Sequence, residues 1–190
     1  MIALRLLTTL ILLLLVAAGC GGQRTTSFTF GEYNFQFIEK VAIIPFENLS
    51  ASKGAGARAT QIFIPEVLAA EVFDVVEPGE VSHVLGKHGI TRTAQLTTEQ
   101  IIKIGGFLKV QALILGSVTE ASNVRSGGSS VKKVSMVVRM VETERGLTVW
   151  SATATAGSRG FWGSLFGTSG KSLSEVTRDC VRKALNTLVK

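Results

Sequence analysis

Lys40-Val-Ala-Ile-Ile-Pro-Phe46 is a short apolar run rich in β-branched residues, and it predicts a core strand. Pro45 cannot donate to a ladder of hydrogen bonds, so the strand is expected to end there. A loop of small residues runs from Asn48 to Gly56, and a helix is expected over 57–70. Pro65 lies inside that stretch and predicts a kink or a new helix start. A strand followed by a helix indicates an α/β arrangement.

The rest of the chain continues this pattern of short strands and amphipathic helices. Further strands are expected at 72–76, 110–119, 134–141 and 147–156, and further helices from Pro78, Thr97 and Ser172. The side chains expected to face the core from the first helix are Ile62, Phe63, Val67 and Leu68. The sequence therefore predicts a single domain of α/β (α+β) class, a mixed β-sheet with helices packed on it, in the order βαβααβββα.

Composition restricts the class of protein. The chain has 190 residues, of which 46% are hydrophobic and 18% charged, so it suits one globular domain and excludes a disordered protein. Two cysteines and two histidines exclude a disulfide scaffold and a multi-cysteine metal site. The net charge of +6 favours an anionic partner, either nucleic acid or a membrane surface.

The first twenty residues are typical of an export signal. One basic residue, Arg5, precedes a short apolar run from Leu6 to Ala18, which is too short for a comfortable membrane span. The run ends in Val16-Ala-Ala-Gly-Cys20, which resembles the lipobox of bacterial lipoproteins. The resemblance implies a signal peptide over 1–19, cleavage before Cys20 and a lipid on its thiol. The lipobox positions are Ala17, Ala18 and Gly19. An ordinary secretory peptide with an incidental cysteine is the alternative.

Residues 20–38 are expected to form the lipidated cysteine, a tether and an extended arm. Gly21 to Ser27 is polar and reaches at most ~25 Å at ~3.5 Å per residue. Gly21 follows the cysteine where an aspartate would indicate inner-membrane retention, so the outer membrane is favoured. Aromatic and polar residues alternate from Phe28 to Phe37. Two interpretations stay open: a first strand packed on its own domain, or an arm that docks on a neighbouring subunit.

Candidate catalytic and metal-binding residues do not form a recognisable site. Lys53-Gly-Ala-Gly56 lacks the GK[ST] ending of a phosphate loop. His83 and His88 are five residues apart and do not share a helix face. Cys180 falls on the apolar stripe of the last helix, where a core residue is expected rather than a nucleophile. We expect no catalytic residue, no metal and no cofactor apart from a covalent lipid on Cys20.

Two connections between the predicted elements are unusual. The first, Ser122–Lys133, is a polar loop between the third and fourth core strands. The second, Gly157–Gly170, holds aromatic and aliphatic residues among glycines, namely Phe161, Trp162, Leu165 and Phe166. Apolar side chains on a glycine-rich loop favour contact with a partner or with a membrane surface. Simple packing onto the domain is the alternative.

A series of short motifs resembles the family of the curli production assembly and transport component, the CsgG family, together with related lipoproteins that activate penicillin-binding proteins. Each motif is weak alone, but their order behind a lipobox is moderately specific. The motifs are Val41-Ala-Ile-Ile-Pro-Phe-Glu-Asn48, Phe73-Asp-Val-Val-Glu77, Ala112-Leu-Ile-Leu-Gly-Ser-Val-Thr119, Ser122-Asn-Val-Arg-Ser-Gly-Gly128, Val137-Val-Arg-Met-Val141 and Thr143-Glu-Arg-Gly-Leu-Thr-Val-Trp150.

The resemblance implies a periplasmic α/β domain over 39–190, tied to the outer membrane by lipid and able to form a ring. It also implies two long membrane-inserting hairpins per subunit, at places that correspond to Ser122–Lys133 and Gly157–Gly170. A hairpin that crosses a membrane needs roughly 20 residues plus a turn, and both segments are shorter. We therefore expect the periplasmic domain without its own pore.

Three functions compete on this basis. The first is a non-enzymatic outer-membrane lipoprotein of curli-secretion type, which acts in envelope assembly or secretion through protein–protein contacts and possible homo-oligomerisation. The second is a regulatory lipoprotein that activates a peptidoglycan synthase. The third is an enzyme or a carrier of small ligands. An exported, lipid-anchored protein is expected to contact the outer membrane and envelope proteins, with no nucleic acid and no small-molecule substrate.

Overall fold

The computed structural model describes residues 25–31, 33–93, 95–126, 129–158 and 171–188. The described strands are β1 (Thr26–Thr29), β2 (Lys40–Ile43), β3 (Glu47–Asn48), β4 (Asp74–Val75), β5 (Ala112–Ser126), β6 (Ser129–Glu142) and β7 (Thr148–Gly157). The described helices are α2 (Ala55–Ala69), α3 (Pro78–Lys87), α4 (Thr98–Leu108) and α6 (Leu173–Leu185), with a short 3-10 helix, η1 (Phe35–Phe37). The predicted order of elements is confirmed, and β1 and β3 are additions to it.

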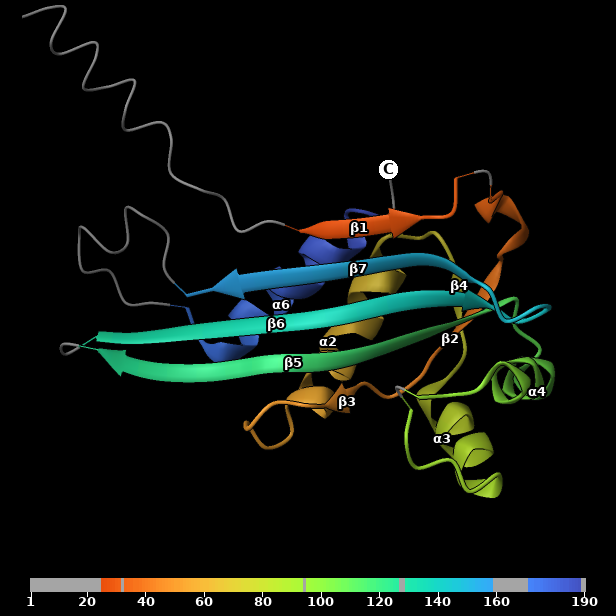
Figure 1. Ribbon diagram of the computed structural model, residues 1–190, viewed down its shortest axis with the longest axis horizontal. Coiled ribbons are helices and arrows are strands. Elements are labelled where there is room, and N and C mark those ends of the chain that lie inside the picture. Colours follow the sequence, from red (N-terminus) through yellow and green to blue (C-terminus); the bar gives the residue numbers. More distant parts are fainter. Residues whose placement is uncertain (1–24, 32, 94, 127–128, 159–170, 189–190) are drawn as a thin grey trace, which may run out of the picture.

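All the described strands belong to one mixed sheet, which runs in the order β1-β7-β6-β5-β2-β4, with β3 paired to β5 (Figure 1). The pairs from β1 to β5 are antiparallel, whereas β2 is parallel to both β5 and β4. Parallel strands need helical crossovers, and the chain supplies α2 between β2 and β4, and α3 with α4 between β4 and β5. The sheet therefore combines a parallel α/β half with an antiparallel meander.

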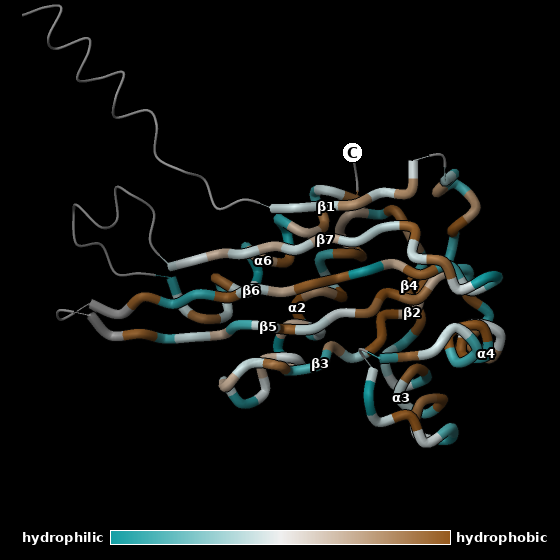
Figure 2. The backbone as a smooth tube through the Cα atoms, viewed as in Figure 1, coloured by the Kyte–Doolittle hydropathy of each residue, from teal (hydrophilic) through white to brown (hydrophobic). Residues whose placement is uncertain are grey.

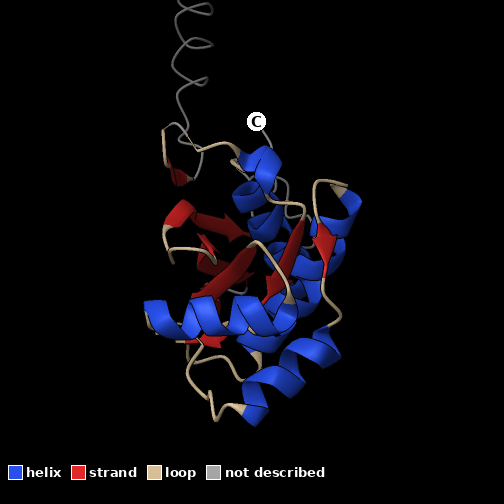
Figure 3. Ribbon diagram, turned by 90° about the vertical axis from the view of Figure 1, so that its right-hand side faces the viewer, coloured by secondary structure: helices blue, strands red, loops and turns tan. Residues whose placement is uncertain are grey.

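Helices cover the two faces of the sheet unequally. Phe63 of α2 and Val181 of α6 belong to one core, against the face of β5, β6 and β7 that carries Trp150. Val81 of α3 and Ile104 of α4 belong to a second core, on the opposite face. Figure 3 shows helices on both sides of the strands, and Figure 2 is brown along β2, where both faces are buried. The second face is covered only over the parallel end of the sheet.

Local sequence signals account for the element boundaries. Thr97 and Ser172 each cap a helix through a complete capping box, as predicted. The turn between β6 and β7 places Gly146 at φ 71, the left-handed conformation predicted for a hairpin glycine. β2 ends at Ile43, just before Pro45. Helix α2 runs through Pro65 without a new start, so the predicted restart is wrong.

The expectation of a loop over Ser122–Lys133 is wrong. β5 continues to Ser126 and β6 begins at Ser129, so this segment forms the outer part of one long hairpin. The backbone pairing of β5 and β6 continues through this segment, from Ser122 opposite Lys133 to Ser126 opposite Ser129. Of the four inward assignments on α2, that of Leu68 is wrong, since its side chain is 51% exposed, whereas Ile62 packs partly buried against the core.

The segment from Phe28 to Phe37 follows the first of its two interpretations. β1 pairs with β7 of its own chain, with Thr26 opposite Thr153 and Thr29 opposite Trp150. The side chains of Phe28 and Phe30 nevertheless remain 53% and 50% exposed. β1 is thus the edge strand of the sheet and carries aromatic side chains that the domain does not bury.

Candidate functional site: the hairpin end of the sheet

The residues predicted to make functional contacts lie outside the described residues. This holds for the lipidation site Cys20, for Ala17, Ala18 and Gly19, and for Phe161, Trp162, Leu165 and Phe166. The described chain begins at residue 25, after the first group, and lies on both sides of the second group, up to Ser158 and from Lys171. No helix in the described part of the chain has the length and hydrophobicity needed to cross a bilayer.

Three parts of the chain meet at one end of the sheet, the end where β7 terminates and the β5–β6 hairpin projects (Figure 1). β1 enters the sheet on the way to this end, opposite Thr153, four residues before β7 terminates at Gly157. β7 leaves the sheet at Gly157, opposite Lys133 of β6. Ser158 and Lys171, the described residues that flank the segment 159–170, both contact Lys132 of β6 at this end. Although the sequence shows these segments far apart, the register of β1, β6 and β7 brings them together.

Lys132 of β6 holds both described flanks of the segment 159–170. Its backbone N–H donates to Ser158 Oγ at 2.9 Å, and its carbonyl accepts from the backbone N–H of Ser158 at 2.8 Å. Its ammonium donates to the carbonyl of Lys171 at 3.1 Å. One residue of the hairpin therefore fixes where the predicted contact segment leaves the domain and where it returns.

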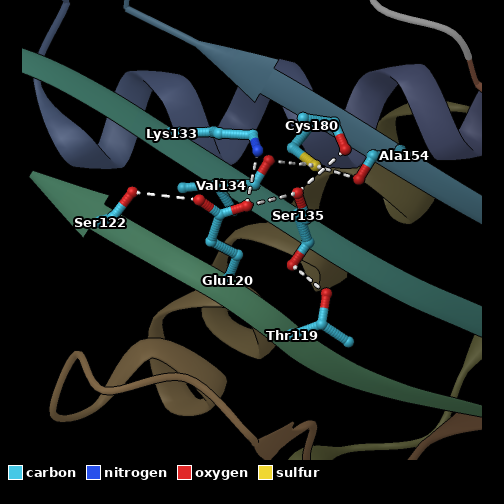
Figure 4. A network of polar contacts seen from close by, with 9 residues as sticks. Thr119, Glu120, Ser122, Lys133, Val134, Ser135, Ala154 and Cys180 are labelled. Carbon is cyan, nitrogen blue, oxygen red and sulfur yellow. Dashed lines mark hydrogen bonds and ion pairs between the residues drawn. The ribbon is translucent and has the colours of Figure 1, made fainter.

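Glu120 of β5 organises a polar network on the uncovered face of the hairpin (Figure 4). Its carboxylate lies 2.8 Å from Lys133 Nζ, and it accepts hydrogen bonds from Ser122 Oγ and Ser135 Oγ. Ser135 Oγ also lies 2.9 Å from Thr155 Oγ1, which extends the network to β7. The Lys133 hydrogen bond lowers the pKa of the Glu120 carboxyl, against the opposing effect of burial. Sequence reasoning missed this network because it took Ser122–Lys133 as a loop.

Cys180 lies on the other face of the same strands. Its side chain is fully buried, and its thiol donates toward the carbonyls of Ala154 at 3.2 Å and Val134 at 3.5 Å (Figure 4). Burial raises the pKa of the thiol to about 12, so the thiolate required of a nucleophile is scarce at neutral pH. The prediction that Cys180 is a core residue is confirmed.

A groove of about 430 Å³ lies between the end of β7 and helix α6. We call it the basic groove, and its lining residues are Ala156, Gly157, Lys171, Asp179, Arg182, Lys183 and Asn186. Lys171 Nζ lies 2.5 Å from Asp179, and Arg182 Nε lies 2.8 Å from Glu66 of α2. Lys183 Nζ donates to the carbonyl of Thr155 at 3.0 Å. Three cations therefore line this groove with one carboxylate.

A second groove, of about 820 Å³, lies at the opposite edge of the sheet, beside β4. We call it the acidic groove, and its lining residues are Phe35, Gln36, Ile38, Glu39, Leu68, Glu71, Val72, Phe73 and Asp74. Its lining holds three carboxylates and no cation. Of its apolar lining residues, Leu68 is 51% and Val72 is 40% exposed, and Phe37 next to the groove is 73% exposed. The two grooves therefore differ in the sign of their charge.

The structure also describes Gly56, His83 and His88, which the sequence raised as possible phosphate- or metal-binding residues. A Cβ at Gly56 would lie 2.2 Å from the carbonyl oxygen of Phe46, so this glycine is required by packing. His88 stacks on Phe107 at 4.4 Å between ring centroids, whereas His83 lies elsewhere on α3. Within the described residues, no group of three or more histidine, cysteine, aspartate or glutamate side chains is placed to hold a metal.

Comparison with solved structures identifies relatives of the fold. The structure is similar to PelC from Paraburkholderia phytofirmans, solved as a dodecamer, with a TM-score of 0.59 and 16% identity over 88% of this chain and 97% of that chain. It is similar to lipoprotein GNA1162 from Neisseria meningitidis, with a TM-score of 0.59 and 19% identity over 79% of this chain and 97% of that chain. At these identities the likeness shows the fold alone.

A family model matches most of the length of this sequence. Nothing among curated proteins matches this chain. The family model described as "Curli production assembly/transport component CsgG" matches residues 34–190, which hold β2 to α6 and both cores. With the motif series from Val41 to Trp150 and the mixed sheet covered by helices on both faces, this match shows that the chain belongs to the CsgG family.

Proposed function

We propose that this chain is an outer-membrane lipoprotein that acts without enzymatic chemistry, through contacts with other polypeptides, in envelope assembly or secretion. The observation that carries the proposal is the family match over 34–190, since the family is described by assembly and transport. The lipobox sequence from Val16 to Cys20 supports the anchor. Acylation of Cys20 attaches the domain to the periplasmic face of the outer membrane, with β1 following the anchor directly.

Contact with other copies of the chain is part of the proposal. PelC, which shares the fold, was solved as a dodecamer. Both edge strands of the described sheet, β1 and β4, adjoin exposed aromatic side chains, with Phe28 and Phe30 at one edge and Phe37 at the other. Open strand edges and exposed apolar side chains mark interaction surfaces. The aromatic side chains from Phe161 to Phe166 supply a further contact in this proposal.

A non-enzymatic role agrees with the chemistry of the described groups. Cys180 is buried and its thiol pKa is about 12. The Glu120 network is a set of mutually satisfied hydrogen bonds on an exposed sheet face. In this proposal the protein acts through its contacts with other polypeptides, and we assign no residue a catalytic role.

Light scattering on detergent-extracted protein tests the oligomeric part of the proposal. We expect a mass of several protomers, reduced by Phe28→Ser combined with Phe37→Ser. The matched control is Ile102→Ser combined with Phe107→Ser, which changes two exposed apolar side chains on α4. A strict monomer at high concentration contradicts the proposal. Recovery of peptidoglycan synthases as the main envelope partners would favour the regulatory lipoprotein instead.

A further inference from the structure

We propose that the basic groove binds the headgroup phosphate of an anionic phospholipid, in the membrane to which Cys20 is attached. The inference rests on the proposed lipid anchor and adds to it a second, electrostatic contact. It predicts that the domain lies against the bilayer in one orientation, with the end of β7 and helix α6 toward the headgroups.

The charge of the basic groove fits a phosphate. Lys171, Arg182 and Lys183 line it, and Asp179 is the one carboxylate among its lining residues. Lys171 and Arg182 each contact one carboxylate, Asp179 and Glu66 respectively. An ammonium has three donors and a guanidinium five, so one such contact leaves each cation able to bind a second anion.

The position of the groove relative to the anchor provides the second argument. Thr26, at the start of β1, lies opposite Thr153. Thr155, whose carbonyl accepts from Lys183 Nζ, is two residues further along the same strand, about 6.6 Å away. Cys20 precedes Thr26 by six residues, a span of at most roughly 21 Å. An acylated Cys20 therefore holds the end of β7 within reach of the headgroups.

The acidic groove indicates which side of the domain faces away from the membrane. It lies beside β4, at the far edge of the sheet from β1, and its lining includes Glu39, Glu71 and Asp74. The negative surface potential of an anionic membrane repels these carboxylates and attracts the basic groove. The acidic groove therefore points away from the bilayer and stays accessible to a protein partner.

Vesicle binding tests the inference. The probe protein is the mature chain from residue 20 with Cys20→Ser, which keeps both cores because they consist of residues from Ile38 onward. We expect it to sediment with vesicles of phosphatidylcholine and phosphatidylglycerol, and not with phosphatidylcholine alone. Lys171→Gln combined with Lys183→Gln is expected to weaken that binding about 25-fold, about fivefold per lysine.

A matched variant separates the contribution of the basic groove to vesicle binding from the contribution of the net charge of the protein. Lys87→Gln combined with Lys103→Gln removes the same charge from α3 and α4, and it is expected to leave vesicle binding within about twofold. Equal loss in both variants overturns the inference, as does equal binding to the two kinds of vesicle. Binding of free inorganic phosphate without a preference for phosphatidylglycerol vesicles also overturns it.

The same experiment separates this inference from the proposed function. Acylation of Cys20 is scored on the wild-type chain by mass spectrometry. If the wild-type chain is acylated but the protein shows no preference for anionic vesicles, the assignment of the basic groove to a phospholipid is wrong. The proposed lipoprotein function is then unaffected. If the Lys171 and Lys183 substitutions instead abolish self-association in light scattering, the groove binds a second copy and the lipid assignment is wrong.

Discussion

The indole Nε1 of Trp150 donates to Thr187 Oγ1 at 3.1 Å, and this bond ties strand β7 to the residues that follow helix α6. Thr187 Oγ1 in turn donates to the carbonyl of Ala184 at 2.8 Å. Trp150 is among the largest fully buried side chains, and it lies on the sheet face that α6 covers. This contact joins the sheet and the last helix into one core.

Truncation of Trp150 is expected to destabilise the domain strongly. Trp150→Ala should lower the free energy of unfolding by about 3–5 kcal/mol, because it removes a fully buried side chain and leaves a cavity. Thr187→Val keeps the volume and removes the hydroxyl, which accepts from Trp150 and donates to the carbonyl of Ala184, so a loss of about 1–3 kcal/mol is expected. Denaturant titration measures both values. Equal losses in the two variants would show that the hydrogen bond, rather than the packing, carries the contribution.

Replacing two helix glycines by alanine is expected to change the stability of the protein in opposite directions. In Gly56→Ala the new Cβ meets the carbonyl oxygen of Phe46 at 2.2 Å, so α2 must move and the protein loses stability. In Gly86→Ala, on α3, nothing lies within 4 Å of the new Cβ, and the change is expected to stabilise by up to about 1 kcal/mol. Thermal unfolding of the two variants measures the contrast. A stabilising Gly56→Ala would contradict the close approach of α2 to residue 46.

The buried thiol of Cys180 makes stability fall at high pH. Burial raises its pKa to about 12 in the folded protein, against about 8.5 in an unfolded chain. Its contribution is therefore fully present below about pH 8.5 and is lost as the pH rises toward 12. From pH 8 to pH 10 the stability advantage of wild type over Cys180→Ala should shrink by about 2 kcal/mol. An advantage that stays constant over this range would mean that the thiol is solvated.

The Glu120–Lys133 pair should stabilise the hairpin weakly and only above acidic pH. The pKa of Glu120 is lowered in the folded protein, so its contribution is present above about pH 4.3 and is lost as the pH falls through the folded value. The carboxylate is 39% exposed, which limits the coupling energy to about 0.2–1 kcal/mol. A double-mutant cycle with Glu120→Gln and Lys133→Gln measures it at pH 7 and at a series of lower pH values. Coupling that does not decline as the pH falls would contradict an ionic origin.

The sequence was sufficient to predict the elements whose pattern reflects a core. Alternation in 147–156 gave the buried face of β7, and the capping boxes gave the starts of α4 and α6. The outer part of the β5–β6 hairpin was missed, because strands that are bonded to each other but not to a core show no hydrophobic periodicity. Val124 opposite Val131 is the one apolar cross-strand pair in this part of the described hairpin.

The candidate site was predictable only in part, for a related reason. The sequence indicated which segments make contacts, namely the lipidated start and the apolar residues from Phe161 to Phe166. The basic groove combines Lys171 with Arg182 and Lys183 from the far end of α6, beside β7. Its assembly depends on how α6 packs on the sheet, which no local motif records. The acidic groove likewise joins η1, α2 and β4 through tertiary packing.

Intact-mass spectrometry of the protein extracted from membranes with detergent tests the central proposal, a domain of the CsgG family held at the membrane by lipid. The account predicts a chain that begins at Cys20 and carries a diacylglycerol thioether and an acylated amino group. It also predicts that Cys20→Ala releases a folded domain from the membrane fraction. A mature chain that begins elsewhere, or that begins at an unmodified Cys20 and stays in the soluble fraction, would contradict it.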